Sequence, residues 1–317
     1  MGSFLLACLL ALFPPAQEDT LRVMFWNLEN FFDNRNDSTT VSDAEFSSRG
    51  ERRWSRKRFR AKCQAVAKGI LWAASEAGGL PDIVGFCEVE NNYVLNQLIR
   101  ETALRKLDYK VVHADSPDSR GIDVALLYRS SRLRLVEERA CHLYQADTVL
   151  ATRDILLCRF SGPYGPFSVL VNHHPSKYGG TAVSGPRRRL AVERLRALAD
   201  SLHALGEERI IAMGDFNDTP DNPVYKLLEP LFASLGEPLH NKGRGSIKYK
   251  GRWDLIDLFF VCPRTLPARM DILSIPFLQV PDRAYGGTKP FRTYSGPRYI
   301  GGVSDHCPIW LSLPFPP

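Results

Sequence analysis

Nine short apolar runs constrain the fold of this chain more than any other feature. They are rich in β-branched and aromatic residues, and turn residues separate them. Such runs predict β-strands. They lie at 21–27, 82–87, 109–113, 122–128, 154–160, 166–172, 209–213, 256–262 and 307–313.

Three other segments predict helices. Apolar residues recur every three to four positions in 57–75 and in 188–204, which is the spacing of one helix face. A shorter helix is predicted after Asn91, as far as Ala103. No internal repeat occurs, and no linker rich in Pro, Gly or Ser divides the middle of the chain. We therefore expect a single α/β domain over 18–317, in which strands outnumber the helices that cover them.

Residues 1–17 predict export. An apolar run from Phe4 to Phe13 is too short to cross a bilayer and long enough for the core of a signal peptide. Leu5-Leu6-Ala7-Cys8 also resembles a bacterial lipobox, so a lipid anchor at Cys8 is the other form of this prediction. A buried N-terminal strand is the alternative, because no Lys or Arg precedes the run. The expected location is periplasmic, extracellular or lipid-anchored at the cell surface.

The seven cysteines are not paired at metal-ligand spacing, which argues against a zinc site. Without Cys8 the number is even, so disulfides remain open in an oxidising compartment. Cys63, Cys87, Cys158 and Cys307 nevertheless stand among apolar residues, where free cysteine behaves as a small hydrophobe. We expect buried free thiols.

Five polar groups stand at the ends of predicted strands, where an α/β scaffold can hold side chains at one shared site. Each alone could cap a helix or close a turn. Together they supply carboxylates, amides and imidazoles. The groups are Asn27 with Glu29, Glu88, Asn172 with His173 and His174, Asp215 with Asn217, and Asp305 with His306.

In this order, the groups resemble the endonuclease/exonuclease/phosphatase family from Val23 to Leu313. The similar blocks are FWNLENFF at 25–32, IVGFCEVE at 83–90, RGIDVALLYR at 120–129, VNHHPSKYGG at 171–180, MGDFND at 213–218, WDLIDLFFV at 253–261 and VSDHCPIW at 303–310. The resemblance implies a four-layer α/β/β/α sandwich, with two packed mixed β-sheets flanked by helices. It also implies metal-dependent hydrolysis of phosphate esters.

The resemblance implies a metal site. Glu88 is similar to the family's principal metal-binding carboxylate, Asp305 to a second acidic position near the ion, and Asn27 to its amide neighbour. Magnesium prefers oxygen ligands and needs only one or two carboxylates. Mg²⁺ is therefore the expected cofactor, with Mn²⁺ and Ca²⁺ left open.

The resemblance also implies acid–base residues. Asp215 is placed like the aspartate that orients or deprotonates the attacking water, and Asn217 like the partner that binds a phosphate oxygen. His306 resembles the histidine that contacts the phosphate, with Asp257 as its buried carboxylate. Such a pair raises the imidazole pKa and fixes its tautomer.

A second histidine is expected beside them. His173 matches the family position, with Asp123 as a weaker candidate for its carboxylate partner. His174 is the alternative to His173, or else a packing or substrate-side residue. Abasic-site endonucleases carry no histidine in this block, whereas DNase-like and sphingomyelinase-like members do, which argues against a dedicated DNA-repair role.

Basic residues suggest a polyanionic substrate. The net charge is +6, and 49–62 holds eight Lys or Arg and one Glu, with Trp54 and Phe59 between them. From this run we expect Arg52, Arg53, Arg56 and Arg58 to contact phosphates, unless it is only a solvated helix face. Arg187, Arg188 and Arg189 open the second long helix, and 242–252 adds further cations.

These features predict a secreted nuclease or related phosphodiesterase that acts as a monomer without an obligate protein partner. One alternative is a sphingomyelinase-like or inositol-phosphatase-like hydrolase, which needs an apolar surface for membranes. The only candidate for that surface is Ile275–Leu278. A non-catalytic binding protein on the same scaffold is the second alternative, and the intact set of acid, amide and imidazole residues argues against it. The long loop 279–303, dense in Gly, Pro and aromatic residues, is expected to be functional.

Overall fold

The computed structural model describes residues 20–36, 40–177 and 180–314. The predicted signal at 1–17, including Cys8, lies outside these residues. Within them, no helix is long and apolar enough to span a membrane.

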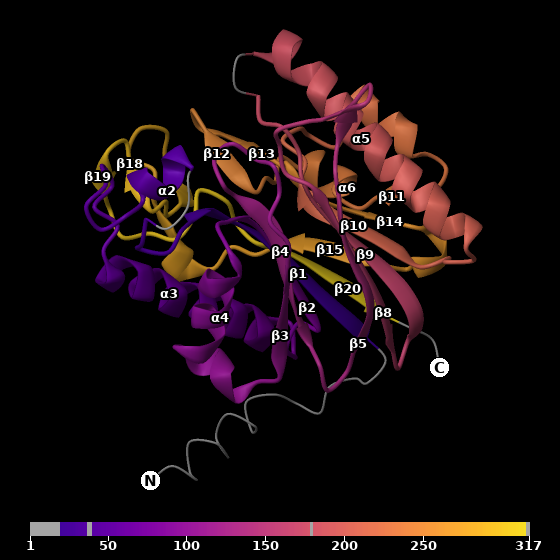
Figure 1. The fold of residues 1–317 in the computed structure, drawn as a ribbon, viewed down its shortest axis with the longest axis horizontal. Helices are drawn as coiled ribbons and strands as arrows, with labels where there is room; N and C mark the ends of the chain where they lie inside the picture. Colours follow the sequence, from indigo (N-terminus) through magenta and orange to yellow (C-terminus); the bar gives the residue numbers. More distant parts are fainter. Residues whose placement is uncertain (1–19, 37–39, 178–179, 315–317) are drawn as a thin grey trace.

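Two six-stranded mixed sheets form the centre of the molecule (Figure 1). The first has the order β15 (Arg269–Ile272), β20 (Ile309–Pro314), β1 (Thr20–Phe31), β2 (Ile83–Val89), β4 (Asp123–Arg129), β3 (Tyr109–His113). The second has the order β11 (Ala233–Ser234), β14 (Asp257–Val261), β10 (Ile210–Asp215), β9 (Gly165–His173), β8 (Ile155–Gly162), β5 (Arg134–Cys141). Each sheet contains one parallel pair, β1 with β2 and β9 with β10.

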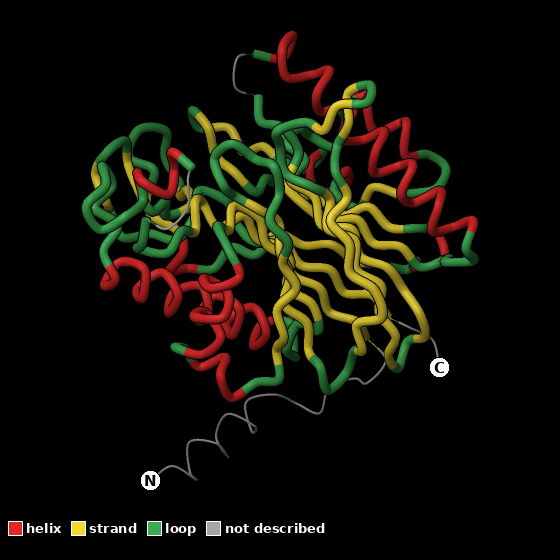
Figure 2. The backbone as a smooth tube through the Cα atoms, in the orientation of Figure 1, coloured by secondary structure: helices red, strands yellow, loops and turns green. Residues whose placement is uncertain are grey.

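Helices cover the outer faces of both sheets, as Figure 2 shows in red. The first sheet carries α3 (Arg56–Glu76) and α4 (Asn92–Arg100), and the second carries α5 (Thr181–Ala204). The short helices α2 (Val41–Glu45) and α6 (Glu237–His240) lie in connecting segments. The predicted four-layer α/β/β/α sandwich is therefore confirmed.

Strand β1 is buried on both faces, which explains its apolar run from Val23 to Trp26. Val23 and Phe25 belong to the apolar cluster that fills the space between the sheets and extends under α5. Met24 and Trp26 belong to the cluster beneath α3 and α4. Successive side chains of a strand point to opposite faces, so one segment joins both cores.

The predicted elements are present with small changes at their ends. All nine predicted strands and all three predicted helices occur, and α5 begins seven residues before the predicted start. The six described cysteines are buried free thiols, as expected. Strand β5 was not predicted, because charged residues occupy half of the positions in this edge strand.

The long loop 279–303 folds into two small hairpins. They are β16 (Gln279–Pro281) with β17 (Thr288–Pro290), and β18 (Tyr294–Ser295) with β19 (Arg298–Tyr299). Tyr294 and Tyr299 pack against Trp54, which lies just before α3. The loop is thereby held beside the N-terminal end of that helix.

Candidate active site

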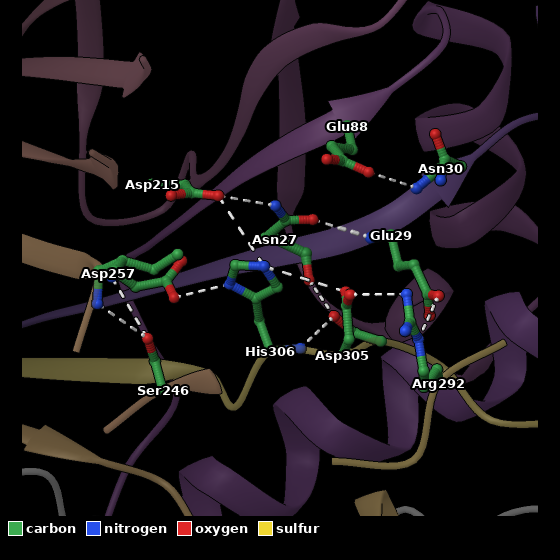
Figure 3. A network of polar contacts seen from close by, with 12 residues as sticks. Asn27, Glu29, Asn30, Glu88, Asp215, Ser246, Asp257, Arg292, Asp305 and His306 are labelled. Carbon is green, nitrogen blue, oxygen red and sulfur yellow. Dashed lines mark hydrogen bonds and ion pairs between the residues drawn. The ribbon is translucent and has the colours of Figure 1, made fainter. Parts of the chain in front are cut away.

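The two parallel pairs end in the same region, and polar side chains from both sheets meet there (Figure 3). Asp215 pairs with His173 at the end of β10 and β9, and Asn27 pairs with Cys87 on β1 and β2. Asn27 Nδ2 donates to Asp215 Oδ2 at 3.0 Å, which joins the two sheets directly. We call His173, Asp215, Asp257 and His306 the acid–base half, and Glu29, Glu88 and Asp305 the carboxylate half.

His306 is held by a buried carboxylate, as predicted. Its Nδ1 lies 2.7 Å from Asp257 Oδ2, and Asp257 is fully buried. Burial alone would lower the pKa of His306, but Asp257, Asp215 and Asp305 together raise that pKa well above its usual value. The ring is therefore cationic at neutral pH, with Nε2 3.9 Å from Asp215 Oδ2.

Two serines hold this dyad in position. Ser304 Oγ accepts a hydrogen bond from the His306 backbone N–H at 2.9 Å and donates to the Asn27 carbonyl at 2.6 Å. Ser246 Oγ accepts from the backbone N–H of Asp257 at 3.3 Å. Neither serine was predicted as a site residue, because its role depends on contacts with distant segments.

Asp215 carries the features of a general base. It is 2% exposed, and its carboxylate accepts hydrogen bonds from Asn27 Nδ2 and from the backbone N–H of Asn217. Burial, followed by the negative charge of Asp257, raises the pKa of Asp215 to about 7. A carboxylate with a pKa near the working pH can accept a proton efficiently.

His173 lies between the two halves. Its Nε2 is 3.8 Å from Asp215 Oδ2 and 3.9 Å from Glu88 Oε1. Burial, followed by the positive charge of Arg153, lowers the pKa of His173 well below its usual value. His173 is therefore neutral and can donate or accept a hydrogen bond without adding charge.

The predicted pairing of Asp123 with His173 is wrong. Asp123 Oδ2 lies 3.1 Å from His113 Nε2, and Asp123 Oδ1 accepts a hydrogen bond from the Ser116 backbone N–H at 2.8 Å. The neighbouring strand β3 supplies His113, so the carboxylate turns toward that edge. Within the described residues, Nδ1 of His173 has no hydrogen-bond partner.

Of the two further roles predicted for His174, packing or contact with substrate, the structure shows packing. It is 2% exposed, and its ring packs edge-on against Phe216 with centroids 4.6 Å apart. Burial lowers the pKa of His174 to about 3, which keeps the ring neutral. Its backbone carbonyl accepts a hydrogen bond from Asn217 Nδ2 at 3.0 Å, so His174 orients the predicted phosphate-binding amide.

Glu88 and its neighbours adopt unusual backbone conformations. Glu88 has φ 60°, and Glu29 and Asn30 have φ 46° and 55°. These left-handed conformations interrupt the strand pairing and are costly for residues other than glycine. They let Glu88 Oε2 accept the backbone N–H of Asn30 at 2.9 Å, which orients the carboxylate.

Two cations that were not predicted stabilise the carboxylate half. Arg292 Nε lies 3.2 Å from Glu29 Oε1, and its Nη2 lies 3.0 Å from Asp305 Oδ2. The buried Lys62 donates to the Glu29 carbonyl at 2.7 Å. Arg292 belongs to the long loop that was expected to be functional, whereas Lys62 looked like one more cation of the basic run.

The carboxylate half fits a hard divalent cation. Burial and the negative charge of Asp305 raise the pKa of Glu29 to about 7, so these carboxylates repel one another even beside Lys62 and Arg292. Carboxylate oxygens are the ligands that Mg²⁺, Mn²⁺ and Ca²⁺ prefer, and added positive charge would relieve the repulsion. Glu88 and Asp305 could hold such an ion. Asn27 Oδ1 accepts the Glu29 backbone N–H at 2.9 Å, so this amide also orients its neighbours.

The four predicted substrate-binding arginines divide into two pairs. Arg52 Nε lies 2.6 Å from Glu45 Oε1, and Arg58 Nη1 donates to the carbonyls of Arg52 and Arg53 at 2.9 Å. The guanidinium of Arg58 also stacks over Tyr299, 4.3 Å from its centroid. Arg52 and Arg58 therefore hold the hairpin loop in place, which corrects their predicted role, while Arg53 and Arg56 are exposed.

Comparison with known proteins now identifies the class of protein. The model of the Endonuclease/Exonuclease/phosphatase family matches residues 22–314, so the chain belongs to this family of phosphoester hydrolases. Among curated proteins, no sequence matches the chain.

Solved structures share the fold at low identity. The human nocturnin catalytic domain with bound sulfate is 18% identical, with a TM-score of 0.61 over 95% of each chain. D. rerio TDP2 in complex with a single-strand DNA product is 16% identical, with a TM-score of 0.53 over 92% of this chain and 98% of that one. A Bacteroides thetaiotaomicron mannosyl-6-phosphatase is 16% identical, with a TM-score of 0.56 over 93% of this chain and 100% of that one.

Proposed function

We propose that this protein is an exported, divalent-metal-dependent phosphodiesterase whose substrate is nucleic acid. The observation that carries the proposal is the position of Asp215. This base lies between the Asp257–His306 pair on one side and, across His173, Glu88 on the other. Asp215 belongs to the second sheet, and the hydrogen bond from Asn27 links it to the first.

The residues divide the work of in-line hydrolysis. Asp215 takes a proton from the attacking water, whose oxygen bonds to phosphorus as the ester bond on the opposite side breaks. The leaving oxygen then takes a proton from the medium. Cationic His306 donates a hydrogen bond to a phosphate oxygen, and Asn217 and neutral His173 bind the same group, so developing negative charge meets fixed donors.

Glu88 and Asp305 would hold the metal ion. A bound divalent ion supplies Lewis-acid stabilisation of charge on the phosphate oxygens. Arg292 and Lys62 orient the carboxylate half and offset part of its charge. This role leaves them little positive charge to offer the substrate, which supports a requirement for metal.

Nucleic acid is favoured over lipid by the surface around the site. Exposed Arg53 and Arg56 lie beside the loop that carries Arg292, and the net charge is +6. The relative TDP2 was solved with a DNA product. The apolar segment considered for membrane contact is a short turn with buried ends, because Ile275 is 2% and Leu278 6% exposed.

A substrate panel tests the proposal. The protein would be incubated with Mg²⁺, Mn²⁺ or Ca²⁺ and offered plasmid, single-stranded DNA, RNA, sphingomyelin, a sugar phosphate and bis(p-nitrophenyl) phosphate. We expect nucleic acid and the chromogenic diester to be cleaved, and expect excess chelator to stop both reactions. Full hydrolysis in chelator would refute the metal requirement. Cleavage of sphingomyelin or the sugar phosphate alone would refute the substrate class.

Export rests on residues 1–17 and needs its own test. We expect the protein outside the cytoplasmic fraction of a bacterial host, and in the membrane fraction only if Cys8 is lipidated. The substitution Cys8→Ala then releases the protein from the membrane if the anchor exists, and changes nothing if the signal is cleaved. Protein confined to the cytoplasm would contradict export.

A further inference from the structure

A cavity of about 560 Å³ lies beside the segment that follows His173 and His174, and no residue of the carboxylate half lines it. Its lining comes from the loop before β4, the segment before β8, the residues after β9 and the start of α5. Three arginines, Arg120, Arg153 and Arg187, line it together with hydroxyl groups. The reaction as described uses none of these side chains.

Arg153 is the buried one of the three arginines. It is only 6% exposed, with Nη1 3.0 Å from Asp118 Oδ2 and Nη2 donating to the His174 carbonyl at 2.7 Å. Its Nε is buried and has no hydrogen-bond partner among the described residues. The hydrogen bonds to Asp118 and to the His174 carbonyl hold the Arg153 guanidinium in a fixed position, so it adds its charge to the wall of the cavity.

The cavity is positively charged overall. Asp118 is the one acidic residue among the lining residues, and it pairs with Arg153 and, at 3.7 Å, with Arg120. Arg120 and Arg187 are exposed. The nearby Asp218 is already neutralised, because Lys177 and Arg188 lie 3.0 Å and 3.2 Å from its oxygens. Three guanidinium groups facing one carboxylate favour an anion.

The cavity is connected to the acid–base half through one carbonyl group. The His174 carbonyl accepts hydrogen bonds from both Arg153 and Asn217, so it lies between the cavity and the phosphate-binding amide. The charges of Arg153 and Arg120 also lower the pKa of His173, after the larger effect of burial, which places both cations within electrostatic reach of that ring. The shared carbonyl therefore places the cavity next to the amide proposed to bind the reacting phosphate.

We propose that this cavity is a subsite for a second phosphate group of the same substrate, next to the phosphate that reacts. The inference rests on the proposed phosphodiesterase function and adds a determinant of specificity. Guanidinium groups bind phosphate oxygens through paired, charge-assisted hydrogen bonds. The second phosphate is either the next diester of a polynucleotide or a terminal monoester, because both present the same oxygens.

Two matched substrates test the subsite. Thymidine 5′-(p-nitrophenyl phosphate) carries only the reacting diester, and its 3′-phosphorylated form adds one phosphate. We expect the added phosphate to raise kcat/KM by roughly tenfold or more, since each tenfold corresponds to the strength of one good charge-assisted contact. A third substrate with a 3′-methylphosphate separates a diester from a monoester as the preferred group.

The ratio of kcat/KM with the 3′-phosphate to kcat/KM without it should fall to about one in the double variant Arg120→Ala with Arg187→Ala. The single substitution Arg187→Ala should reduce it, and provides a milder test should the double variant be unstable. Arg189→Ala is the matched control, because Arg189 is an exposed cation of the same helix that pairs with Glu193 at 2.8 Å and does not line the cavity. The control should keep both its activity and the ratio.

The outcomes separate the subsite from the function. A wild-type ratio near one, or a ratio unchanged in the double variant, overturns the subsite while leaving phosphodiesterase activity intact. If no diester is cleaved, the proposed function fails, and binding of pyrophosphate in excess chelator then judges the cavity alone. Tighter binding by wild type than by the double variant supports the subsite, and equal binding overturns it.

Discussion

The two halves of the site differ in their access to water. In the acid–base half, the side chains of His173, Asp215 and Asp257 are 2%, 3% and 0% exposed. In the carboxylate half, those of Glu29, Glu88 and Asp305 are 9%, 16% and 36% exposed. Both halves contain acidic groups, and the acid–base half is distinguished by its two histidines and by its deeper burial.

This difference indicates separate roles for the two halves. Burial shifts the pKa of Asp215 upward and that of His173 downward, which gives the acid–base half one base and one neutral imidazole at the same pH. The open carboxylate half leaves room for an ion that keeps some of its water, as Mg²⁺ does. In the proposed mechanism, the acid–base half therefore transfers the proton and the carboxylate half binds the ion.

The largest expected effect is the loss of the base in the buried half. Asp215→Asn should lower turnover of bis(p-nitrophenyl) phosphate by about 10²–10⁴-fold, the usual contribution of general acid–base catalysis. Metal affinity should change little, which a titration of the variant with Mn²⁺ would show. Asp200→Asn, an exposed carboxylate on the outer face of α5, is the control. Near-normal turnover in folded Asp215→Asn protein would refute the role of Asp215.

Loss of the Glu88 carboxylate in the carboxylate half should lower activity through weaker binding of the metal ion instead. Glu88→Gln should weaken binding of Mn²⁺ by at least about tenfold. Loss of a residue that only orients a metal ligand already costs about that much, and Glu88 is the proposed ligand itself. Raised metal concentration should restore part of the activity, in contrast to Asp215→Asn. Glu76→Gln at the end of α3 is a matched control. Unchanged metal affinity in the Glu88 variant would show that the ion binds elsewhere.

Removal of the carboxylate behind His306 should reveal the effect of burial on pH dependence. Asp257→Asn removes the largest effect that raises the pKa of His306, so this pKa falls and the cationic form of the ring is less populated as pH rises. The loss of activity relative to wild type should be roughly tenfold greater at pH 8 than at pH 6, since a pKa change of one unit changes the population of the cationic ring tenfold. A pH–rate profile and NMR titration of the ring would measure this shift. Identical profiles for wild type and variant would contradict it.

The same substitution predicts a stability change of defined sign. A folded-state pKa raised above the unfolded value adds stability that is fully present below the unfolded pKa and is lost as pH rises through the folded pKa. Because the pKa of His306 is raised, the stability deficit of Asp257→Asn should be greatest below about pH 6.5. Thermal unfolding across this range would test the sign, and a deficit that grows with pH would contradict it.

The smallest expected effect concerns the rim of the open half. Arg53→Ala with Arg56→Ala should weaken binding to single-stranded DNA by a few-fold and flatten the salt dependence by a slope of about 1–2, one unit for each lost phosphate contact. Hydrolysis of the small chromogenic diester should not change. The control pair is Arg264, which follows β14, and Arg269, which begins β15. Replacing both with Ala removes the same charge and should preserve DNA binding. Equal effects of both pairs would refute a specific rim.

Much of the fold could be predicted from sequence because its signals are local. Buried strands such as β10 contain an apolar run, here Ile210 to Met213, and helix 57–75 has a regular apolar face. The Asp257–His306 pair and the position of Asp215 at the site also emerged from motifs. In contrast, the pairing of Asp123 with His113, rather than His173, depends on which neighbouring strand its carboxylate faces, and spacing along the chain carries no such information.

The roles of the cations could not be predicted for a related reason. Arg52 and Arg53 are adjacent and chemically identical, yet one is bound to Glu45 and the other is exposed. Arg292 reaches Glu29 across 263 positions of sequence. Local composition identifies a basic segment, but only tertiary contacts distinguish a cation that holds a loop from one that meets solvent.

The pairing of β1 with β20 has a consequence for how the site is assembled. Val23 lies opposite Leu311, and Phe25 opposite Ile309. Strand β1, near the start of the described chain, therefore pairs with the last strand, which is synthesised last. Contacts between such distant segments close late in folding, because the intervening chain must first lose its entropy. Asp305 and His306 directly precede β20 and arrive with it. A nascent chain that has not yet supplied its last strand therefore has no competent active site.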